Sequence, residues 1–283
     1  MVEIGVCIEP FFGDIPYKER IEKIASIGFK YYEFWFHNAG FDGKNLTDEK
    51  KDFDMIAEFN YKLGLTTTCF VHCHPDGGIK ASLINKDDRG LILNSLTEEI
   101  IPLAKKIGCK GLISGSGNVN PFISEKEAIE NIVETLIQIS KIVEKEDITL
   151  LLEPWNTKVD HPLNFLSDPQ MAVNIIKDVN HKNIKLLYDI YHMQIMKGDI
   201  VRFIRENIQY IGHFHIAGVP GRKEPIDNEL YYPFIIKESV AAGYKGVFGL
   251  EYWPTMPSEK SLEKVLEYLT GDLYETENYV RPF

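Results

Sequence analysis

Eight short segments of the chain are rich in β-branched, aromatic and other apolar residues, and several are nearly continuous in apolar side chains. Unbroken apolar runs of this length are typical of parallel strands that are buried on both faces. The segments predicted as strands are residues 3–8, 31–36, 66–72, 111–114, 148–153, 184–189, 210–216 and 246–252.

Amphipathic segments lie between these runs. In the longest of them, residues 124–144, apolar positions recur every three or four residues from Ala128 to Ile139, which is the spacing of one helix face. The segments predicted as helices are residues 18–27, 48–62, 91–107, 124–144, 168–179, 199–207, 233–242 and 258–269. Three of them are followed by a glycine that is predicted to end the helix: Gly28, Gly64 and Gly108.

Eight strands that each precede a helix predict a single (β/α)₈ barrel, a TIM barrel of the α/β class. Six or seven such units would instead be compatible with an open, doubly wound sheet. We expect the barrel to span residues 1–270, because no linker rich in Pro, Gly or Ser divides them. Residues 271–283 form a tail whose apolar side chains are predicted to pack on the barrel or on a neighbouring subunit, which favours a homo-oligomer.

The connections predict which end of the barrel is functional. Three segments that follow strands, residues 36–46, 72–82 and 154–165, are long and polar, whereas the helices return to the next strand through short turns. Active sites of such barrels lie in the loops at the carboxyl ends of the strands. We therefore expect the functional face there.

Charge and composition narrow the function classes. The chain has 42 acidic and 31 basic residues, a formal charge of −11, which disfavours binding to nucleic acid. No segment reaches the roughly 18 uncharged apolar residues that cross a bilayer. The first residues show no basic region followed by an apolar stretch, so we expect neither membrane insertion nor export. Four cysteines do not make a disulfide scaffold, and they fit a cytoplasmic protein.

Each of the last four predicted strands ends in a residue that can bind a metal: Glu153, Asp189, His215 and Glu251. Because these strands are neighbours in a closed barrel, the four side chains are expected to converge, and three buried carboxylates require a cation. We predict one divalent metal ion bound by all four. The oxygen-rich set favours Mn²⁺ or Mg²⁺, with Co²⁺ and Zn²⁺ as alternatives. His213, two positions before His215, is expected to be packed or hydrogen-bonded.

Three further residues are candidates for binding a substrate. His192 follows the strand 184–189 by three positions and can face the same cavity. Arg222 lies in a Gly/Pro-constrained loop after the seventh strand, where a guanidinium can hold a carboxylate or a hydroxyl. His72 is expected near the cavity end of the third strand.

Four stretches of sequence resemble a known family: Leu152-Glu153-Pro154, Tyr188-Asp189-Ile190-Tyr191-His192-Met193-Gln194, residues 211–225 and Gly249-Leu250-Glu251-Tyr252. Through them the chain resembles the hydroxypyruvate isomerase branch of the xylose isomerase-like TIM barrels. This superfamily contains sugar isomerases, epimerases and relatives of endonuclease IV. The first half of the chain agrees mainly in its rhythm of strands and helices.

The resemblance implies that the predicted donors are the metal ligands, that Glu153 and Glu251 form an acid–base pair, and that His192 and Arg222 contact the substrate. It also implies an activity: aldose–ketose isomerisation of a small hydroxycarbonyl compound or sugar. One proton would move between adjacent carbons through an enediolate.

Other activities remain as alternatives. His215 favours 3-epimerisation of a ketose at the same residues, because the hydroxypyruvate isomerase branch often has Gln there. A more distant alternative is a barrel that binds a sugar without turnover. Endonuclease relatives have an Asp-x-His pair after the seventh strand, whereas this chain has Asp227-Asn228-Glu229. Together with the charge, this disfavours a DNA substrate.

Overall fold

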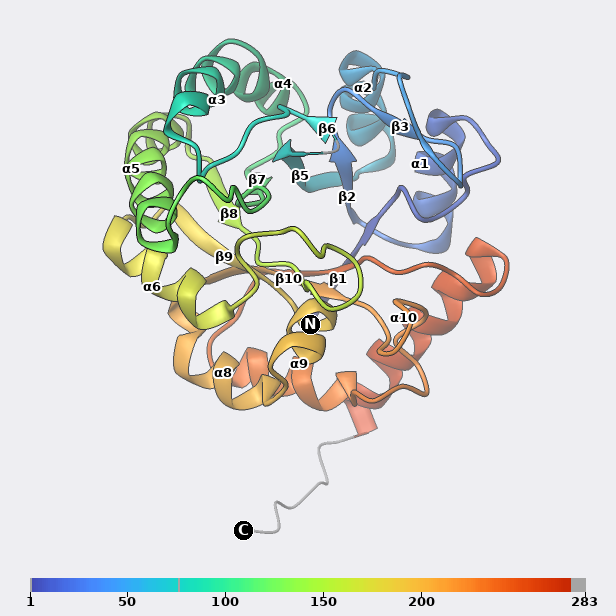
Figure 1. The fold of residues 1–283 in the computed structure, drawn as a ribbon. Helices are drawn as coiled ribbons and strands as arrows, with labels where there is room; N and C mark the ends of the chain where they lie inside the picture. The colour runs from blue at the N-terminus through green and yellow to red at the C-terminus, as the bar shows by residue number, and fades with distance from the viewer. Residues whose placement is uncertain (1, 76, 276–283) are drawn as a thin grey trace.

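In the computed structural model, which describes residues 2–75 and 77–275, eight parallel strands close into a barrel surrounded by helices (Figure 1). The barrel strands are β1 (Glu3–Cys7), β2 (Tyr31–Phe36), β5 (Thr66–His74), β7 (Gly111–Ser114), β8 (Thr149–Leu152), β9 (Ile184–Asp189), β10 (Ile211–Ile216) and β11 (Val247–Leu250). They pair in that order, and β11 pairs with β1 to close the barrel. The predicted single α/β barrel is confirmed.

Helices form the outer layer of the molecule. They are α1 (Tyr17–Ile27), α2 (Phe53–Leu63), α3 (Arg89–Ser95), α4 (Ile101–Lys106), α5 (Glu125–Val143), α6 (Pro169–Val179), α8 (Ile200–Asn207), α9 (Tyr232–Ala241) and α10 (Ser258–Glu275). A π-helical turn, Leu96–Ile100, joins α3 to α4, so the predicted helix 91–107 is one continuous segment. Short 3₁₀ turns cover Lys86–Asp88, Glu144–Glu146 and Ile208–Tyr210.

Three short strands belong to loops on the functional face. Strands β3 (Gly40–Phe41) and β4 (Leu46–Thr47) pair with each other, and β6 (Gly77–Gly78) pairs with the end of β5. Because Thr47 is part of this hairpin, the helix predicted from residue 48 begins only at Phe53. Asp52 caps it, since its carboxylate accepts hydrogen bonds from the backbone N–H groups of Asp54 and Met55.

A short helix that the sequence pattern did not predict follows β9 directly. This helix, α7 (Ile190–Met196), begins at the residue after Asp189, the last residue of the strand, so no loop separates the two elements. Asp189 caps it by accepting a hydrogen bond from the His192 backbone N–H at 3.0 Å. Asp189 is therefore both the last residue of β9 and the N-cap of α7.

The ends of other helices follow the sequence prediction. Gly28 and Gly64 adopt left-handed conformations, with φ of 107° and 66°, at the C-termini of α1 and α2. Helix α10 continues to Glu275. The predicted packing of the tail concerns side chains beyond residue 271, which lie outside the described residues. No helix among the described residues is long and apolar enough to span a membrane.

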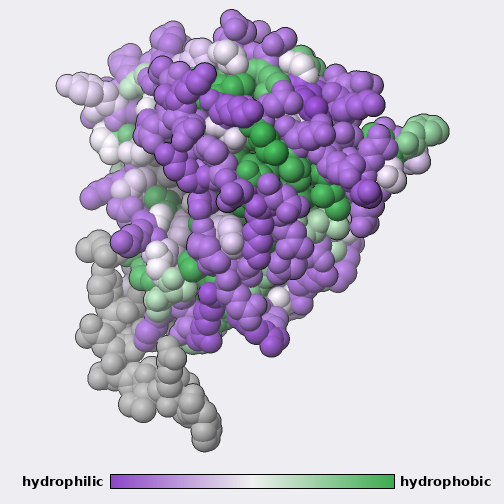
Figure 2. Space-filling model, turned by 90° about the vertical axis from the view of Figure 1, so that its left-hand side faces the viewer, coloured by the Kyte–Doolittle hydropathy of each residue, from purple (hydrophilic) through white to green (hydrophobic). Residues whose placement is uncertain are grey.

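The main hydrophobic core lies between the barrel and the helices. The outer face of the helical layer is mostly hydrophilic, although a band of hydrophobic side chains crosses the side shown in Figure 2. Inside the barrel a smaller apolar cluster contains Phe36, Cys69, Val71, Ile113, Leu151 and Leu187. Buried polar side chains from β2 and β10 lie in the barrel as well, and they support the site described next.

Candidate active site

The four predicted metal ligands converge at the carboxyl ends of β8 to β11. The sheet register places His215 beside Asp189 on one neighbouring strand and beside Gly249 on the other. One possible ligand atom from each of Glu153, Asp189, His215 and Glu251 lies within 4.8 Å of all the others. All four residues are buried, and none is more than 8% exposed. The four side chains therefore converge as predicted, and their binding of a metal stays a prediction.

The atoms that face one another in this cluster suit a cation. Glu153 Oε1, Asp189 Oδ2 and His215 Nδ1 are buried and have no hydrogen-bond partner among the described residues. Burial, together with the charges of Glu153 and Glu251, raises the pKa of Asp189 to about 7 against the opposing Arg222 and His215. Unpaired buried carboxylates are costly unless a positive charge is placed among them. The donor set therefore fits one divalent metal ion.

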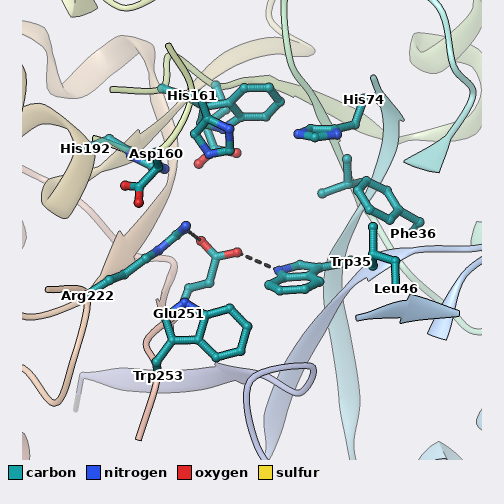
Figure 3. Close-up of a pocket in the computed structure, with 13 residues that line it drawn as sticks. Trp35, Phe36, Leu46, His74, Asp160, His161, His192, Arg222, Glu251 and Trp253 are labelled. Carbon is teal, nitrogen blue, oxygen red and sulfur yellow. Dashed lines mark hydrogen bonds and ion pairs between the residues drawn. The ribbon is translucent and has the colours of Figure 1, made fainter. Parts of the chain in front are cut away.

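Glu251 is held from both sides. Its Oε1 accepts a hydrogen bond from Trp35 Nε1 at 2.8 Å, and its Oε2 accepts one from Arg222 Nη2 at 2.6 Å. Burial would raise the pKa of Glu251, but Arg222 and His215 outweigh it and lower the pKa. The carboxylate is therefore ionised and fixed in orientation. Figure 3 shows it between the guanidinium and the indole.

A buried carboxylate from β2, that of Glu33, contacts the Nε2 side of the His215 ring. Glu33 Oε1 lies 3.0 Å from His215 Nε2, and Glu33 Oε2 lies 2.7 Å from His213 Nε2. A side chain at Gly249 would collide with Glu33, because an added Cβ would lie 2.0 Å from Glu33 Oε1. The glycine thus lets Glu33 reach His215, whose Nδ1 then faces Glu251 at 3.1 Å. His213 is hydrogen-bonded, as predicted.

The three predicted substrate-binding residues have different positions. His192 and Arg222 line the cavity above the donor cluster, and Arg222 Nη2 also lies 3.7 Å from Asp189 Oδ2. His72 is completely buried, with its Nδ1 3.1 Å from the carbonyl oxygen of Ile113, and does not line this cavity. A substrate contact by His72 stays a prediction.

The cavity has a volume of about 300 Å³ and opens at the carboxyl ends of the strands. It is lined by Trp35, Phe36, Leu46, Val71, His74, Glu153, Trp155, Asp160, His161, His192, Arg222, Glu251 and Trp253. Figure 3 shows Trp35, Trp253 and Leu46 on one side, with Asp160, His161 and His192 on the other. One wall is therefore mostly apolar and the opposite wall carries most of the hydrogen-bonding groups.

Several lining residues were missed by the sequence reasoning. Trp155, Asp160 and His161 come from the long loop after β8, whose polarity was noted although its residues were not assigned. Trp155 packs between His74 and His161, with ring centroids 4.6 and 5.1 Å away and both ring pairs tilted. The tryptophan directly after the Glu153-Pro154 strand end was the available signal.

Comparisons with known proteins agree with this geometry. A family model described as xylose isomerase-like TIM barrel matches residues 21–271. The hydroxypyruvate isomerase of Escherichia coli is 30% identical over 273 residues, which cover 93% of this chain and 97% of that protein. A human protein named putative hydroxypyruvate isomerase is 35% identical over 176 residues, which cover 60% of this chain and 64% of that protein.

A solved structure also matches along nearly the whole chain. The crystal structure named AP endonuclease, family 2, from Brucella melitensis is 28% identical, with a TM-score of 0.82, and the match covers 95% of this chain and 99% of that one. The family model covers far more than half of the chain, and the full-length relative is named an isomerase. The chain therefore belongs to the xylose isomerase-like TIM barrel family, in its hydroxypyruvate isomerase-like branch, and it is an isomerase.

Proposed function

We propose that the chain is a metal-dependent isomerase of a small hydroxycarbonyl compound or sugar, acting by proton transfer between Glu153 and Glu251. The observation that carries this proposal is the pair itself. Both carboxylates belong to the buried four-donor cluster, and both also line the cavity. A carboxylate that touches the cavity can accept or donate a proton on a bound substrate.

Glu153, Asp189, His215 and Glu251 would hold one divalent ion, with Mn²⁺ or Mg²⁺ favoured by three oxygen-donor residues and one imidazole. When bound, the ion supplies a Lewis acid that stabilises negative charge on a substrate oxygen. Co²⁺ and Zn²⁺ are compatible with the same residues.

The proton moves through the chain's own carboxylates. Isomerisation removes a proton from one carbon and returns one to its neighbour, so it needs a base and an acid at adjacent atoms. Glu251 is fixed by Trp35 and Arg222, whereas Glu153 Oε1 has no hydrogen-bond partner among the described residues. We assign the transfer to this pair. One carboxylate removes the proton from the first carbon and the other delivers a proton to the neighbouring carbon, while the hydroxyl proton passes to the former carbonyl oxygen; proton exchange with water then restores both carboxyl groups.

Arg222 and His192 would bind the oxygens of the substrate. The guanidinium faces the cavity and carries the positive charge that a carboxylate or an enediolate oxygen requires. A cavity of about 300 Å³ lies at the lower end of the range for small-molecule sites, which supports a short substrate. The formal charge of −11 supports a small molecule rather than nucleic acid.

The second candidate is a ketose 3-epimerase, and His215 is the observation that favours it. Epimerisation uses the same two carboxylates, but one removes the proton from a carbon and the other delivers a different proton to that same carbon from the opposite face. A barrel that binds a sugar without turnover does not require two carboxylates that line the cavity, so Glu153 and Glu251 disfavour this alternative. The two reactions differ in product and not in the residues required.

We also propose a cytoplasmic homo-oligomer. All four cysteines are buried and free of disulfides in the described part of the chain, which fits a reducing compartment.

Three exposed apolar side chains offer surface for a second copy of the chain: Phe122, which is 93% exposed, Val119 and Leu163. Val119 and Leu163 lie on two loops that are joined by a backbone hydrogen bond of 2.7 Å. Light scattering after size exclusion would test this, and a monomer at all concentrations would contradict it.

The activity test is product analysis by NMR. The protein is incubated with hydroxypyruvate, a tetronate-type sugar acid and a panel of ketoses, each with Mn²⁺ or Mg²⁺ and each with EDTA. An isomer formed only with metal supports the first proposal, and a C3 epimer supports the second. If a compound from the panel stabilises the metal-loaded protein against heat but is not converted, this result supports a barrel that binds a sugar without turnover and contradicts catalysis.

A further inference from the structure

His192 has two ring nitrogens in different surroundings. Its Nδ1 lies 2.7 Å from Asn156 Nδ2, and both side chains are completely buried. Its Nε2 lies 3.5 Å from Asp189 Oδ2 and has no hydrogen-bond partner among the described residues. Because the ring lines the cavity, the proton that it carries decides whether it offers a donor or an acceptor there.

The orientation of the Asn156 amide is settled by its own loop. Asn156 Oδ1 accepts hydrogen bonds from the backbone N–H groups of Val159 at 2.9 Å and Asp160 at 3.0 Å. If oxygen and nitrogen were exchanged, an NH₂ group would face two N–H donors. The amide nitrogen therefore points the other way, where it donates to Asp160 Oδ2 at 2.6 Å.

The second hydrogen of that NH₂ group points to His192. An amide NH₂ can only donate, so His192 Nδ1 must accept and carries no proton. The single proton of the neutral ring is then on Nε2.

We propose that Asn156 fixes His192 as the Nε2–H tautomer, so that His192 offers a hydrogen-bond donor to a substrate oxygen in the cavity. Asn156 is thus a positioning residue for His192. In the other tautomer, Nε2 would present a lone pair toward Asp189 Oδ2 and could not donate to a carbonyl or enediolate oxygen of the substrate. A donor at this place stabilises negative charge as it develops on an enediolate oxygen.

Tyr191 strengthens the arrangement from the far side of Asp160. Its hydroxyl donates to Asp160 Oδ2 at 2.8 Å, the same oxygen that accepts from Asn156. Asp160 therefore has two neighbouring donors that hold it as an acceptor. The orientation of the Asn156 amide, and through it the tautomer of His192, follows from groups of residues 156–160 and from the Tyr191 hydroxyl. No bound ligand is needed for it.

The tautomer can be measured directly in the resting protein. Long-range ¹H–¹⁵N spectra of protein labelled with ¹⁵N-histidine distinguish a protonated ring nitrogen from an unprotonated one, and Mg²⁺ is used because it is diamagnetic. The chain has eight histidines, so the His192→Gln variant assigns the signals. We expect protonated Nε2 and unprotonated Nδ1 for His192. A protonated Nδ1 in the unmodified protein would overturn the proposal.

The Asn156→Asp variant tests the cause. A carboxylate still accepts from the two backbone N–H groups. It also faces Asp160 Oδ2 where the amide donated, so the two carboxyl groups share one proton, which Asp160 carries and donates. The new side chain then presents an acceptor to His192, so Nδ1 should become protonated. Unchanged His192 signals would overturn the role of Asn156. The matched control is Asn164→Asp on the same loop. Asn164 is buried and bonds to Ser116 and Leu166, so this change should leave the His192 signals where they are.

The activity readout rests on the proposed function. In Asn156→Asp we expect kcat to fall about 10²-fold with KM little changed, as for loss of one donor to a developing charge. Equal changes in kcat and KM in both Asp variants would indicate general damage to the loop and contradict a specific role. If the expected tautomer is observed but no substrate is converted, the proposed function fails while the tautomer assignment holds.

Discussion

The two halves of the barrel contribute different things to one cavity. Strands β8 to β11 and the loops that follow them supply all four proposed metal ligands, together with the polar wall around Asp160, His161 and His192. The first half supplies mostly apolar lining, which includes Trp35, Phe36, Leu46 and Val71. The second half therefore carries the groups that can react with or hydrogen-bond a substrate, and the first half mainly determines the shape of the cavity. Changes in the second half should remove turnover, and changes in the first half should alter rate or substrate preference more mildly.

The division is not complete, because the first half reaches the donors at two points. Trp35 donates a hydrogen bond to Glu251, and Glu33 lies behind His215. Both side chains come from β2 and cross the barrel interior. If these two contacts matter for turnover, substitutions in the first half should lower kcat and not only change substrate preference.

The largest effect is expected for the two proposed proton carriers. Replacing Glu153 or Glu251 by Gln should lower turnover by about 10²-fold or more, because an amide cannot exchange the proton. The fold should persist, since an amide of the same size fills the same space. Steady-state kinetics and thermal unfolding measure the two properties. If both variants keep nearly full activity, the assignment of the pair is wrong.

Metal binding is expected to depend almost as strongly on the second half. Mn²⁺ should raise the unfolding temperature of the unmodified protein, because an ion that binds only the folded state contributes about 2.7 kcal/mol at 100 times its Kd. Asp189→Asn should lose most of this increase, since the variant lacks one ligand charge.

Asp168→Asn is the matched control for the metal experiment. Asp168 caps α6 as Asp189 caps α7, but it lies outside the donor cluster. This variant should keep the full metal-dependent increase in unfolding temperature. An increase that survives in Asp189→Asn would place the ion elsewhere.

A smaller effect is expected where the first half touches the donors. Trp35→Phe keeps a ring in contact with Phe41 and Trp253 but removes the N–H group that orients Glu251. A hydrogen bond to a charged group contributes about 1.5–3 kcal/mol, so kcat should fall by about tenfold or more. Trp253→Phe changes a ring of the same aromatic cluster and should reduce kcat less. Equal losses in the two variants would mean that ring packing, and not the hydrogen bond, is what matters.

The smallest effect is expected at the rim of the apolar wall. Leu46 is 40% exposed and lines the cavity from β4. Leu46→Ala should shift the ratio of kcat/KM between a longer and a shorter substrate by about threefold, because a half-exposed side chain contributes only part of its burial energy. The kcat for the shorter substrate should stay unchanged. A tenfold loss of that kcat would show that the wall participates in the chemistry.

The barrel and the donor cluster could be predicted from sequence because both depend on short-range pattern. Strands β2, β7 and β9 begin and end at the predicted residues, and three of the four donors, Glu153, Asp189 and Glu251, directly follow an apolar run. The polar wall could not be predicted in this way. Trp155 and His161 lie on a loop whose path depends on tertiary contacts, such as the hydrogen bond of 2.7 Å between Val119 and Leu163.

Long-range pairing also explains what was missed inside the barrel. Glu33 is 180 positions from its partner His213, and its approach to His215 depends on the absence of a side chain at Gly249. A single sequence carries no signal for such a contact. Helix α7 was missed for a different reason, because it follows β9 with no loop between them and has only seven residues, which are too few to show a helical period.

The most direct test of the central claim is solvent exchange during turnover. The metal-loaded protein is incubated in D₂O with hydroxypyruvate and, separately, with each sugar of the panel, and the position of deuterium is determined by NMR. We expect deuterium at the carbon that receives the proton, and we expect EDTA and Glu153→Gln each to abolish its incorporation. Conversion of a substrate with deuterium incorporation that is unaffected by EDTA and by the loss of either carboxylate would contradict the central claim.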